Sequence, residues 1–330
     1  MAETKAKEKS GGKKVNAKLI GSLAPYIGLV LVIIVFAILT KGALLSTTNL
    51  QSLTNQVIVT ALVAIGAVFV FGAGYFDMSM GGTICFAAVV GGMVAIKTGS
   101  LFWAGLVILL ISLAFGIIKG LFAAYINVPF FIFTIVLGSV ISSVVLVMMG
   151  SESTIYLDNA VKEIHTFTFV EMTIINVVCL VVFFIICVIL FCYTPIGIKV
   201  KNMGGNPVSA RQSGIALKKT TVQTFMISAI GMAIAAFIIL IRTRTVGGST
   251  AGTVGNDVIV ALVLGGMPLS GGPRSKISAG LVGAVTITIL NSGLTILGLT
   301  TGQIQICRGI IFIIVVFVSS FSYRGKLLPR

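Results

Sequence analysis

Charged side chains are scarce in this sequence, and acidic ones are the scarcest. Lysine and arginine together number 23, aspartate and glutamate 8, and histidine 1. Charged residues make up 9% of the chain, whereas they make up about 25% of a typical soluble domain. The sequence offers no catalytic set of serine, histidine and aspartate, no close pair of carboxylates and no metal cluster. The composition therefore argues against an enzyme and predicts a chain that binds no cofactor of its own.

Cysteine is also infrequent, with 5 residues and no C-x-x-C spacing of the kind that metal and redox sites use. All of the cysteines fall in apolar runs or at their ends. We therefore interpret them as small buried hydrophobic side chains.

Long apolar runs dominate what is present. The chain is 57% hydrophobic and its mean hydropathy is +1.14. A membrane-spanning helix needs about 20 predominantly apolar residues, and runs of this length recur along the whole sequence. The pattern predicts an all-α, polytopic transmembrane bundle of about ten spans. The predicted spans are 20–40, 56–75, 78–96, 101–126, 130–149, 172–193, 221–241, 256–268, 277–298 and 304–322.

The basic residues predict which side of the membrane each loop occupies. Lysines crowd the polar stretch 1–19, and no signal-peptide cleavage site follows it, so we expect a retained first span. If the N-terminus is cytosolic, most of the lysines and arginines fall on the cytosolic side, as the positive-inside rule requires. The cytosolic segments are then the tail 1–19, a tight turn near residue 76, the loops 127–129, 194–220 and 269–276, and the tail 323–330.

One stretch of the loop 194–220, MGGNPVSARQSGIALKKT at 203–220, resembles a piece of soluble protein. Asn206 suits a helix N-cap, Pro207 the first helical position, and Gly214 the left-handed residue beyond the end. About two turns between them are too short to be stable alone. Because the loop is basic and lacks acids, two interpretations stay open. The helix could rest on anionic lipid headgroups, or dock onto a cytosolic partner, with Ala210 allowing close approach.

Two acids, Asp77 and Asp257, are predicted at or near membrane depth, where a carboxylate costs about 2.5–3.5 kcal/mol at a span centre. Each precedes an apolar run, so we interpret both as helix N-terminal caps, with substrate contact as the alternative. We expect Arg308, near the start of the last span, to extend its side chain to the outer surface. The span 256–268 is short and ends at Pro268, which suggests half of a broken helix lining a cavity.

Several longer motifs occur in a fixed order along the chain. They are TPIGIKVKNMGGNPVSARQSGIALKK, GYFDMSMGG with Asp77, Ser79 and Gly81, NVPFFIFTIVLG, and NDVIVALVLGGMPLSGG. Together they resemble the coupling loop, the D-x-S-x-G turn, the Pro-Phe-Ile-x-Thr-x-Gly segment and the late core of ribose- and galactose-type ABC sugar permeases. The similarity extends over nearly all of 25–322. Lys119 is a departure, because the family commonly has a neutral polar residue there.

This resemblance implies a permease domain over 20–322, with both termini cytosolic, in the bacterial cytoplasmic membrane. It also implies a second permease subunit, ATPase subunits that use ATP and Mg, and an extracytoplasmic binding protein that delivers a monosaccharide. No nucleic-acid partner is implied. The sequence independently calls for a separate motor, because it contains no G-x(4)-G-K-[ST] phosphate loop.

The resemblance also implies two groups of site residues. Residues implied in coupling to the ATPase are Asn206, Pro207, Ala210, Arg211, Ser213 and Gly214. Candidates for the substrate pathway, where hydroxyl-rich ligands meet aromatic and hydrogen-bonding groups, are Tyr75, Phe76, Asp77, Ser79, Thr134, Asn256 and Asp257.

Two alternatives remain at this point. A nucleoside or branched-chain amino acid permease of the ABC class shares parts of this architecture. A secondary transporter driven by an ion gradient would need intramembrane carboxylates or an ion site of unwound backbone, and the scarcity of acids argues against it.

Overall fold

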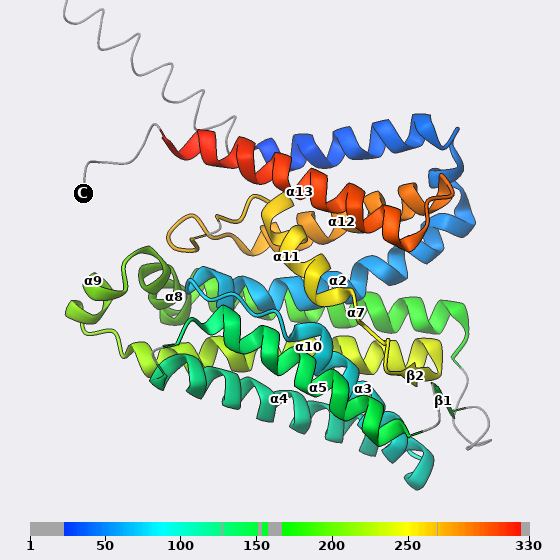
Figure 1. Ribbon diagram of the computed structural model, residues 1–330, viewed down its shortest axis with the longest axis horizontal. Coiled ribbons are helices and arrows are strands. Elements are labelled where there is room, and N and C mark those ends of the chain that lie inside the picture. The colour runs from blue at the N-terminus through cyan, green and yellow to red at the C-terminus, as the bar shows by residue number, and fades with distance from the viewer. Residues whose placement is uncertain (1–22, 127, 151–153, 158–166, 269, 325–330) are drawn as a thin grey trace, which may run out of the picture.

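The computed structural model describes residues 23–126, 128–150, 154–157, 167–268 and 270–324. Most of its helices run roughly lengthwise and pack side by side in one bundle (Figure 1). The predicted N-terminal tail 1–19 lies outside the described residues, as do residues 325–330 of the predicted C-terminal tail.

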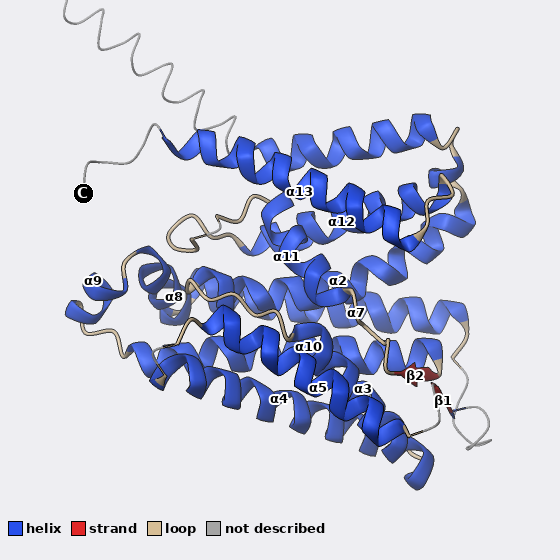
Figure 2. Cartoon of the chain, in the orientation of Figure 1, coloured by secondary structure: helices blue, strands red, loops and turns tan. Residues whose placement is uncertain are grey.

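The described part of the chain is almost entirely helical (Figure 2). A two-stranded antiparallel sheet joins two loops at one end of the bundle, with Ile155 of β1 opposite Val246 of β2. The elements in chain order are the helix Leu23–Leu39, η1 (Ala43–Leu45), α2 (Thr47–Gly72), α3 (Met80–Thr98), α4 (Leu101–Tyr125), α5 (Phe130–Met149), β1 (Thr154–Tyr156), α7 (Phe169–Val188), η2 (Ile189–Tyr193), α8 (Pro195–Gly205), α9 (Pro207–Gln212), α10 (Leu217–Thr243), β2 (Thr245–Gly247), α11 (Val254–Leu264), α12 (Ile277–Ile296) and α13 (Thr301–Arg324).

Seven of the described helices are long and apolar enough to cross a membrane. They are α2, α3, α4, α5, α7 with its continuation η2, α10 and α12. Three further apolar helices are shorter, namely Leu23–Leu39, α11 and the stretch Thr301–Phe317 of α13. Each predicted span therefore coincides with an apolar helix, and the all-α polytopic fold is confirmed. The count of about ten spans stays a prediction.

Helices α2 and α10 form the centre of the bundle, and most of their side chains are buried. Small residues bring the two helices together. A Cβ added to Gly231 of α10 would lie 2.7 Å from the carbonyl oxygen of Leu62 in α2, and one added to Gly66 would lie 3.1 Å from the Cα of Ser228. Close backbone approach through small residues is the usual packing mode of membrane helices, because it maximises van der Waals contact.

Helices α4, α5 and α7 form an outer layer with large exposed apolar side chains. Val147 of α5 is 81% exposed and Val170 of α7 is 64% exposed, although both lie in strongly apolar helices. A continuous apolar surface of this extent is unfavourable in water but favourable against lipid hydrocarbon. The exposed faces thus agree with a multi-pass membrane protein.

Two helices begin earlier than predicted because polar residues cap them. Helix α2 begins at Thr47 rather than near 56, and the Ser46 hydroxyl accepts a hydrogen bond from the Asn49 backbone N–H. Helix α7 begins at Phe169 rather than 172, where Thr168 and Glu171 form a reciprocal capping box. Apolar runs therefore located the long apolar parts of these helices but not their capped first turns.

Candidate functional site

The connection between α2 and α3, residues 73–79, is not the tight cytosolic turn that the sequence suggested. It is an irregular segment that starts beside α8 and runs to the middle of the bundle, where α3 begins (Figure 1). Asp77 and Ser79 on this segment are 1% and 0% exposed. Without a helix, its backbone groups need other partners. Met78 N–H donates to Thr134 Oγ1 of α5 at 3.1 Å, and Tyr75 N–H donates to the Val70 carbonyl.

A buried ion pair holds the far end of this segment. Lys119 of α4 places its Nζ 2.7 Å from Asp77 Oδ2 and 3.4 Å from Thr83 Oγ1. Lys119 is 0% exposed. The other oxygen of Asp77, Oδ1, accepts hydrogen bonds from the backbone N–H and the hydroxyl of Ser79, at 2.8 and 2.7 Å. Both charges are therefore compensated inside the bundle, as a buried charge requires.

This arrangement extends the capping interpretation of Asp77. The N-cap of α3 is Ser79, whose own side chain makes no cap hydrogen bond, whereas Asp77 Oδ1 accepts the Ser79 backbone N–H at the helix start. Asp77 also joins the segment to α4. The departure noted at Lys119 was the signal that could have pointed to a partner, because a lysine within a span must pair with something.

Asp257 and Arg308 form a second ion pair, between α11 and α13. Arg308 is 9% exposed, and Asp257 is 7% exposed. The expectation that Arg308 extends to the outer surface is therefore wrong, because its guanidinium is directed inward to a carboxylate. Asp257 lies in the first turn of α11, whose N-cap Thr253 makes no side-chain cap bond. Asp257 is therefore not the N-cap of α11, and its carboxylate pairs with Arg308.

The beginnings of α3 and α11 meet each other. A Cβ added to Gly81 of α3 would lie 2.9 Å from the carbonyl oxygen of Ala251, and one added to Gly255 of α11 would lie 3.1 Å from the N of Gly81. Gly81 therefore serves close packing of the two helix starts. Asn256, the next residue of α11, is exposed. The structure thus brings the predicted pathway residues of 76–79, 134 and 256–257 to one region, between helices that belong to distant parts of the sequence.

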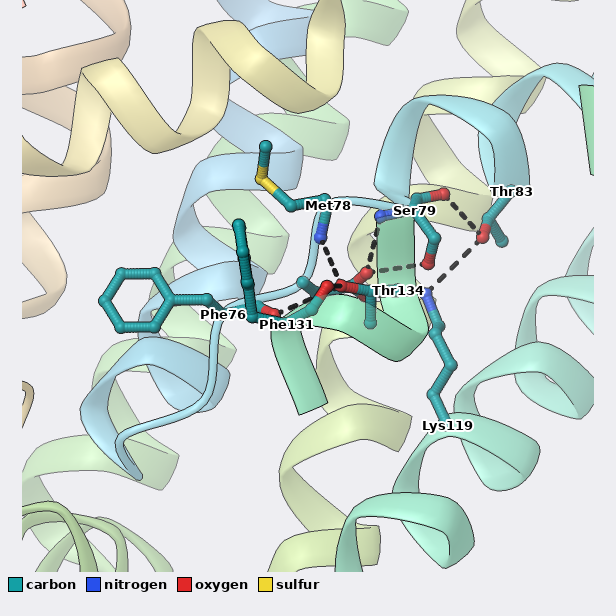
Figure 3. Close-up of polar contacts among 8 residues, drawn as sticks. Phe76, Met78, Ser79, Thr83, Lys119, Phe131 and Thr134 are labelled. Carbon is teal, nitrogen blue, oxygen red and sulfur yellow. Dashed lines mark hydrogen bonds and ion pairs between the residues drawn. The ribbon is translucent and has the colours of Figure 1, made fainter. Parts of the chain in front are cut away.

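Two aromatic side chains of the segment have different surroundings. The Tyr75 hydroxyl lies 3.3 Å from Thr221 Oγ1 of α10, and its ring packs edge-on to Phe130. Phe76 is half-buried and stacks edge-on to Phe71. Figure 3 shows that Phe76 and Lys119 extend to opposite sides of the segment. The hydroxyls of Tyr75, Ser79 and Thr134 all have protein partners in this conformation.

The predicted short helix is present as α9, which projects beyond the ends of the long helices (Figure 1). Asn206 is its N-cap, and Asn206 Oδ1 accepts hydrogen bonds from the N–H groups of Val208 and Ser209 at 3.0 and 3.1 Å. Pro207 occupies the first helical position. Ala210 is 3% exposed and faces the protein, while Arg211 is exposed.

A Schellman motif ends α9. Ile215 N–H donates to the Ala210 carbonyl, Gly214 N–H donates to the Arg211 carbonyl, and Gly214 has φ +79°. This pair of hydrogen bonds with a left-handed glycine is the commonest way to satisfy the last carbonyls of a helix. The predicted local geometry of residues 206–214 is therefore confirmed.

Lysines surround α9 and partly pack on aromatic rings. Lys201 Nζ lies 4.6 Å from the Phe191 ring centroid, and Lys218 Nζ lies 4.1 Å from that of Tyr125. Such cation–π contacts keep long basic side chains at the protein surface. Within the described residues, no group of histidine, cysteine, aspartate and glutamate is arranged to hold a metal ion.

The ion pair of Lys119 and Asp77 can be tested by a double-mutant cycle. Lys119→Met and Asp77→Asn each leave one buried charge alone, which costs about 3–5 kcal/mol. The double variant removes both charges, so we expect it to be more stable than either single variant. Thermal unfolding of the detergent-purified protein measures this. A double variant as unstable as the sum of the two single variants would show that the two groups do not interact.

The chain matches the family described as "Branched-chain amino acid transport system / permease component" over residues 49–318. It is 27% identical to the ribose import permease protein RbsC of Haemophilus influenzae over 307 residues, which cover 92% of this chain and 94% of the relative. The ribose import permease protein RbsC of Bacillus subtilis is 28% identical over 301 residues, covering 90% and 92%.

The xylose transport system permease protein XylH of Escherichia coli (strain K12) is 25% identical over 380 residues, covering 96% of this chain and 95% of the relative. No solved structure gives a significant match. Because the family match spans most of the chain and includes both ion pairs and α9, this protein belongs to that family of transport-system permease components.

Proposed function

We propose that this chain is the membrane-spanning permease subunit of an ATP-binding-cassette importer that translocates a neutral monosaccharide. The observation that carries the proposal is α9, a short, capped, basic helix that projects beyond the bundle and has no evident use within a self-contained transporter. The similarity to ribose and xylose permeases supports a pentose or a related sugar as the substrate.

A neutral substrate also fits the charges of the candidate pathway. Asp77 is paired with Lys119, and Asp257 with Arg308, so both carboxylates are already neutralised by protein groups. A substrate ammonium group would have to compete with these short-range partners. The family description names branched-chain amino acids, which keeps an amino acid or a nucleoside as the second candidate substrate class.

The remaining partners follow from this assignment. ATPase subunits, which use ATP and Mg, would bind at the end of the bundle that carries α9. A second permease subunit and an extracytoplasmic sugar-binding protein would complete the complex. The basic residues of the loop 194–220 and of the α11–α12 loop, Arg274 and Lys276, support a cytosolic location for this end, because the positive-inside rule favours lysine and arginine in cytosolic loops. The bilayer is then the bacterial cytoplasmic membrane, with both termini on its inner side.

Reconstitution tests the function. We expect the chain alone in liposomes to show neither ATP hydrolysis nor concentrative uptake, because it lacks a phosphate loop. Uptake of ribose, xylose or galactose should require an ATPase partner and an extracytoplasmic binding protein, together with ATP. Leucine and adenosine serve as competing substrates. Accumulation by the lone subunit under a proton or sodium gradient would contradict the proposal, and preferred uptake of leucine or adenosine would correct its substrate.

Asn256 tests the pathway. Its side chain is exposed at the point where α11 and α3 meet, so Asn256→Ala should raise the half-saturating sugar concentration severalfold while the melting temperature stays unchanged. Ser143→Ala is the matched control, because Ser143 is an exposed polar residue of the outer helix α5. Equal uptake kinetics in the two variants would remove Asn256 from the pathway.

Substitutions at Gly214, beyond the end of α9, and at Arg211, within α9, test the proposed coupling role of this helix. A Cβ at Gly214 meets no atom within 4 Å, so Gly214→Val acts only through the positive φ that β-branched residues resist. We expect Gly214→Val and Arg211→Glu to abolish the stimulation of ATP hydrolysis by loaded binding protein and to reduce uptake steeply. Gly214→Asn, which tolerates this backbone conformation, and Arg211→Lys are the matched controls.

The lipid-headgroup alternative predicts another result for the same variants. Loss of one basic contact would cost about 1 kcal/mol of membrane attraction, and Gly214→Val would be nearly silent. Normal coupling in both Gly214→Val and Arg211→Glu would therefore assign α9 to the membrane surface.

A further inference from the structure

Four glycines meet where α9 joins the bundle. We call them the glycine junction: Gly72 at the end of α2, Gly204 near the end of α8, and Gly271 and Gly272 in the loop between α11 and α12. The Gly272 N–H donates a hydrogen bond of 2.9 Å to the Gly72 carbonyl. Three chain segments that are far apart in the sequence are thus joined at one point.

The junction has no room for side chains. A Cβ added to Gly204 would lie 2.1 Å from the carbonyl oxygen of Gly72 and 2.6 Å from the N of Gly272. One added to Gly271 would lie 2.3 Å from the Phe71 carbonyl oxygen. Gly271 and Gly272 also have φ values of +66° and +90°, which L side chains rarely adopt. Backbone therefore contacts backbone directly at all three segments.

Direct backbone contact has a mechanical consequence. A side chain between two helices can change rotamer and absorb a small displacement, whereas close-packed backbones transmit it. When α8 moves, Gly204 must push on Gly72 and Gly272, because no flexible group lies between them.

The junction lies between the two parts of the proposed transport machinery. On one side, Gly204 is followed by Gly205 and then by Asn206, the N-cap of α9. On the other side, Gly72 is followed by segment 73–79, whose far end is held by Lys119 and Thr134. Fewer than ten residues of chain therefore separate α9 from Asp77 along this route, by way of the contact between Gly204 and Gly72.

We propose that Gly204 is a positioning residue for transport, through which movement of α9 is transmitted to segment 73–79 and to the α11–α12 loop. The inference rests on the proposed coupling role of α9 and adds the route by which α9 acts. Gly204 touches neither substrate nor ATPase in this proposal; it sets the position of Gly72 and Gly272 relative to α8.

The test compares Gly204→Ala with Gly283→Ala in the complex reconstituted with its ATPase subunits and binding protein. A Cβ at Gly283 would lie 1.7 Å from the Ala261 carbonyl oxygen, so this variant imposes similar crowding between α11 and α12, away from the junction. We expect Gly204→Ala to hydrolyse ATP but to import about tenfold less sugar per ATP, a loss typical of broken coupling between sites. Gly283→Ala should lower the melting temperature and keep the wild-type amount of sugar per ATP.

If sugar imported per ATP falls equally in both variants, the junction contributes only packing, and the proposal is wrong. A wild-type amount of sugar per ATP in Gly204→Ala would also overturn the proposal.

If Gly204→Ala fails to assemble, Gly205→Ala provides the test. Its Cβ would meet only the Pro273 ring, at 3.1 Å from Cδ, so it pushes on the same loop more gently. A reduced ratio in Gly205→Ala supports the route, and a wild-type ratio contradicts it.

Arg211→Glu, measured alongside, separates this inference from the function on which it rests. If Arg211→Glu uncouples the complex while Gly204→Ala does not, α9 couples by another route. If the wild-type complex itself imports no sugar, the proposed function fails first.

Discussion

An apolar interior tolerates a charged side chain only beside an opposite charge or several hydrogen-bonding groups, and this requirement fixes how the inner helices of the bundle are placed. Lys119 and Asp77 join α4 to segment 73–79 at 2.7 Å, and Arg308 and Asp257 join α13 to α11. In each pair, one residue lies on a long helix and the other beside the start of a helix that follows an irregular segment. Separating either pair would leave a charge alone in a low-dielectric interior.

The same compensation allows irregular backbone to lie inside the bundle. Segment 73–79 keeps Asp77 and Ser79 buried because Lys119, Thr134 and its own side chains supply the partners that a helix would otherwise provide. Non-helical backbone at membrane depth is tolerated only where it is buried in protein or lines a cavity. The start of α3 can therefore approach the start of α11 closely, and the candidate pathway residues gather where these helices meet.

Glycine supplies the second constraint, which concerns distance rather than charge. At Gly81 and Gly255 it lets two helix starts touch, and at Gly204 and Gly72 it lets α8 rest directly on the end of α2. The ion pair of Asp77 with Lys119 holds segment 73–79 at its far end, and the glycine contacts hold it at its near end. An element held at both ends moves as a unit with its neighbours.

The sequence by itself determined the features that depend on neighbouring residues. Apolar runs located a helix at each predicted span, and Asn206, Pro207 and Gly214 predicted α9 with its N-cap and its left-handed glycine, because such signals act over a few residues. Only the tertiary structure decided the partners of the buried charges. Lys119 and Asp77 are 42 positions apart. The sequence suggested that Arg308 extends outward, whereas helix packing brings Asp257 beside it. The turn expected near residue 76 is instead an irregular segment inside the bundle, because Lys119 of α4 and Thr134 of α5 supply its partners. A long apolar run shows that a stretch can lie in a membrane. The partner of a buried charge depends instead on which helices lie side by side.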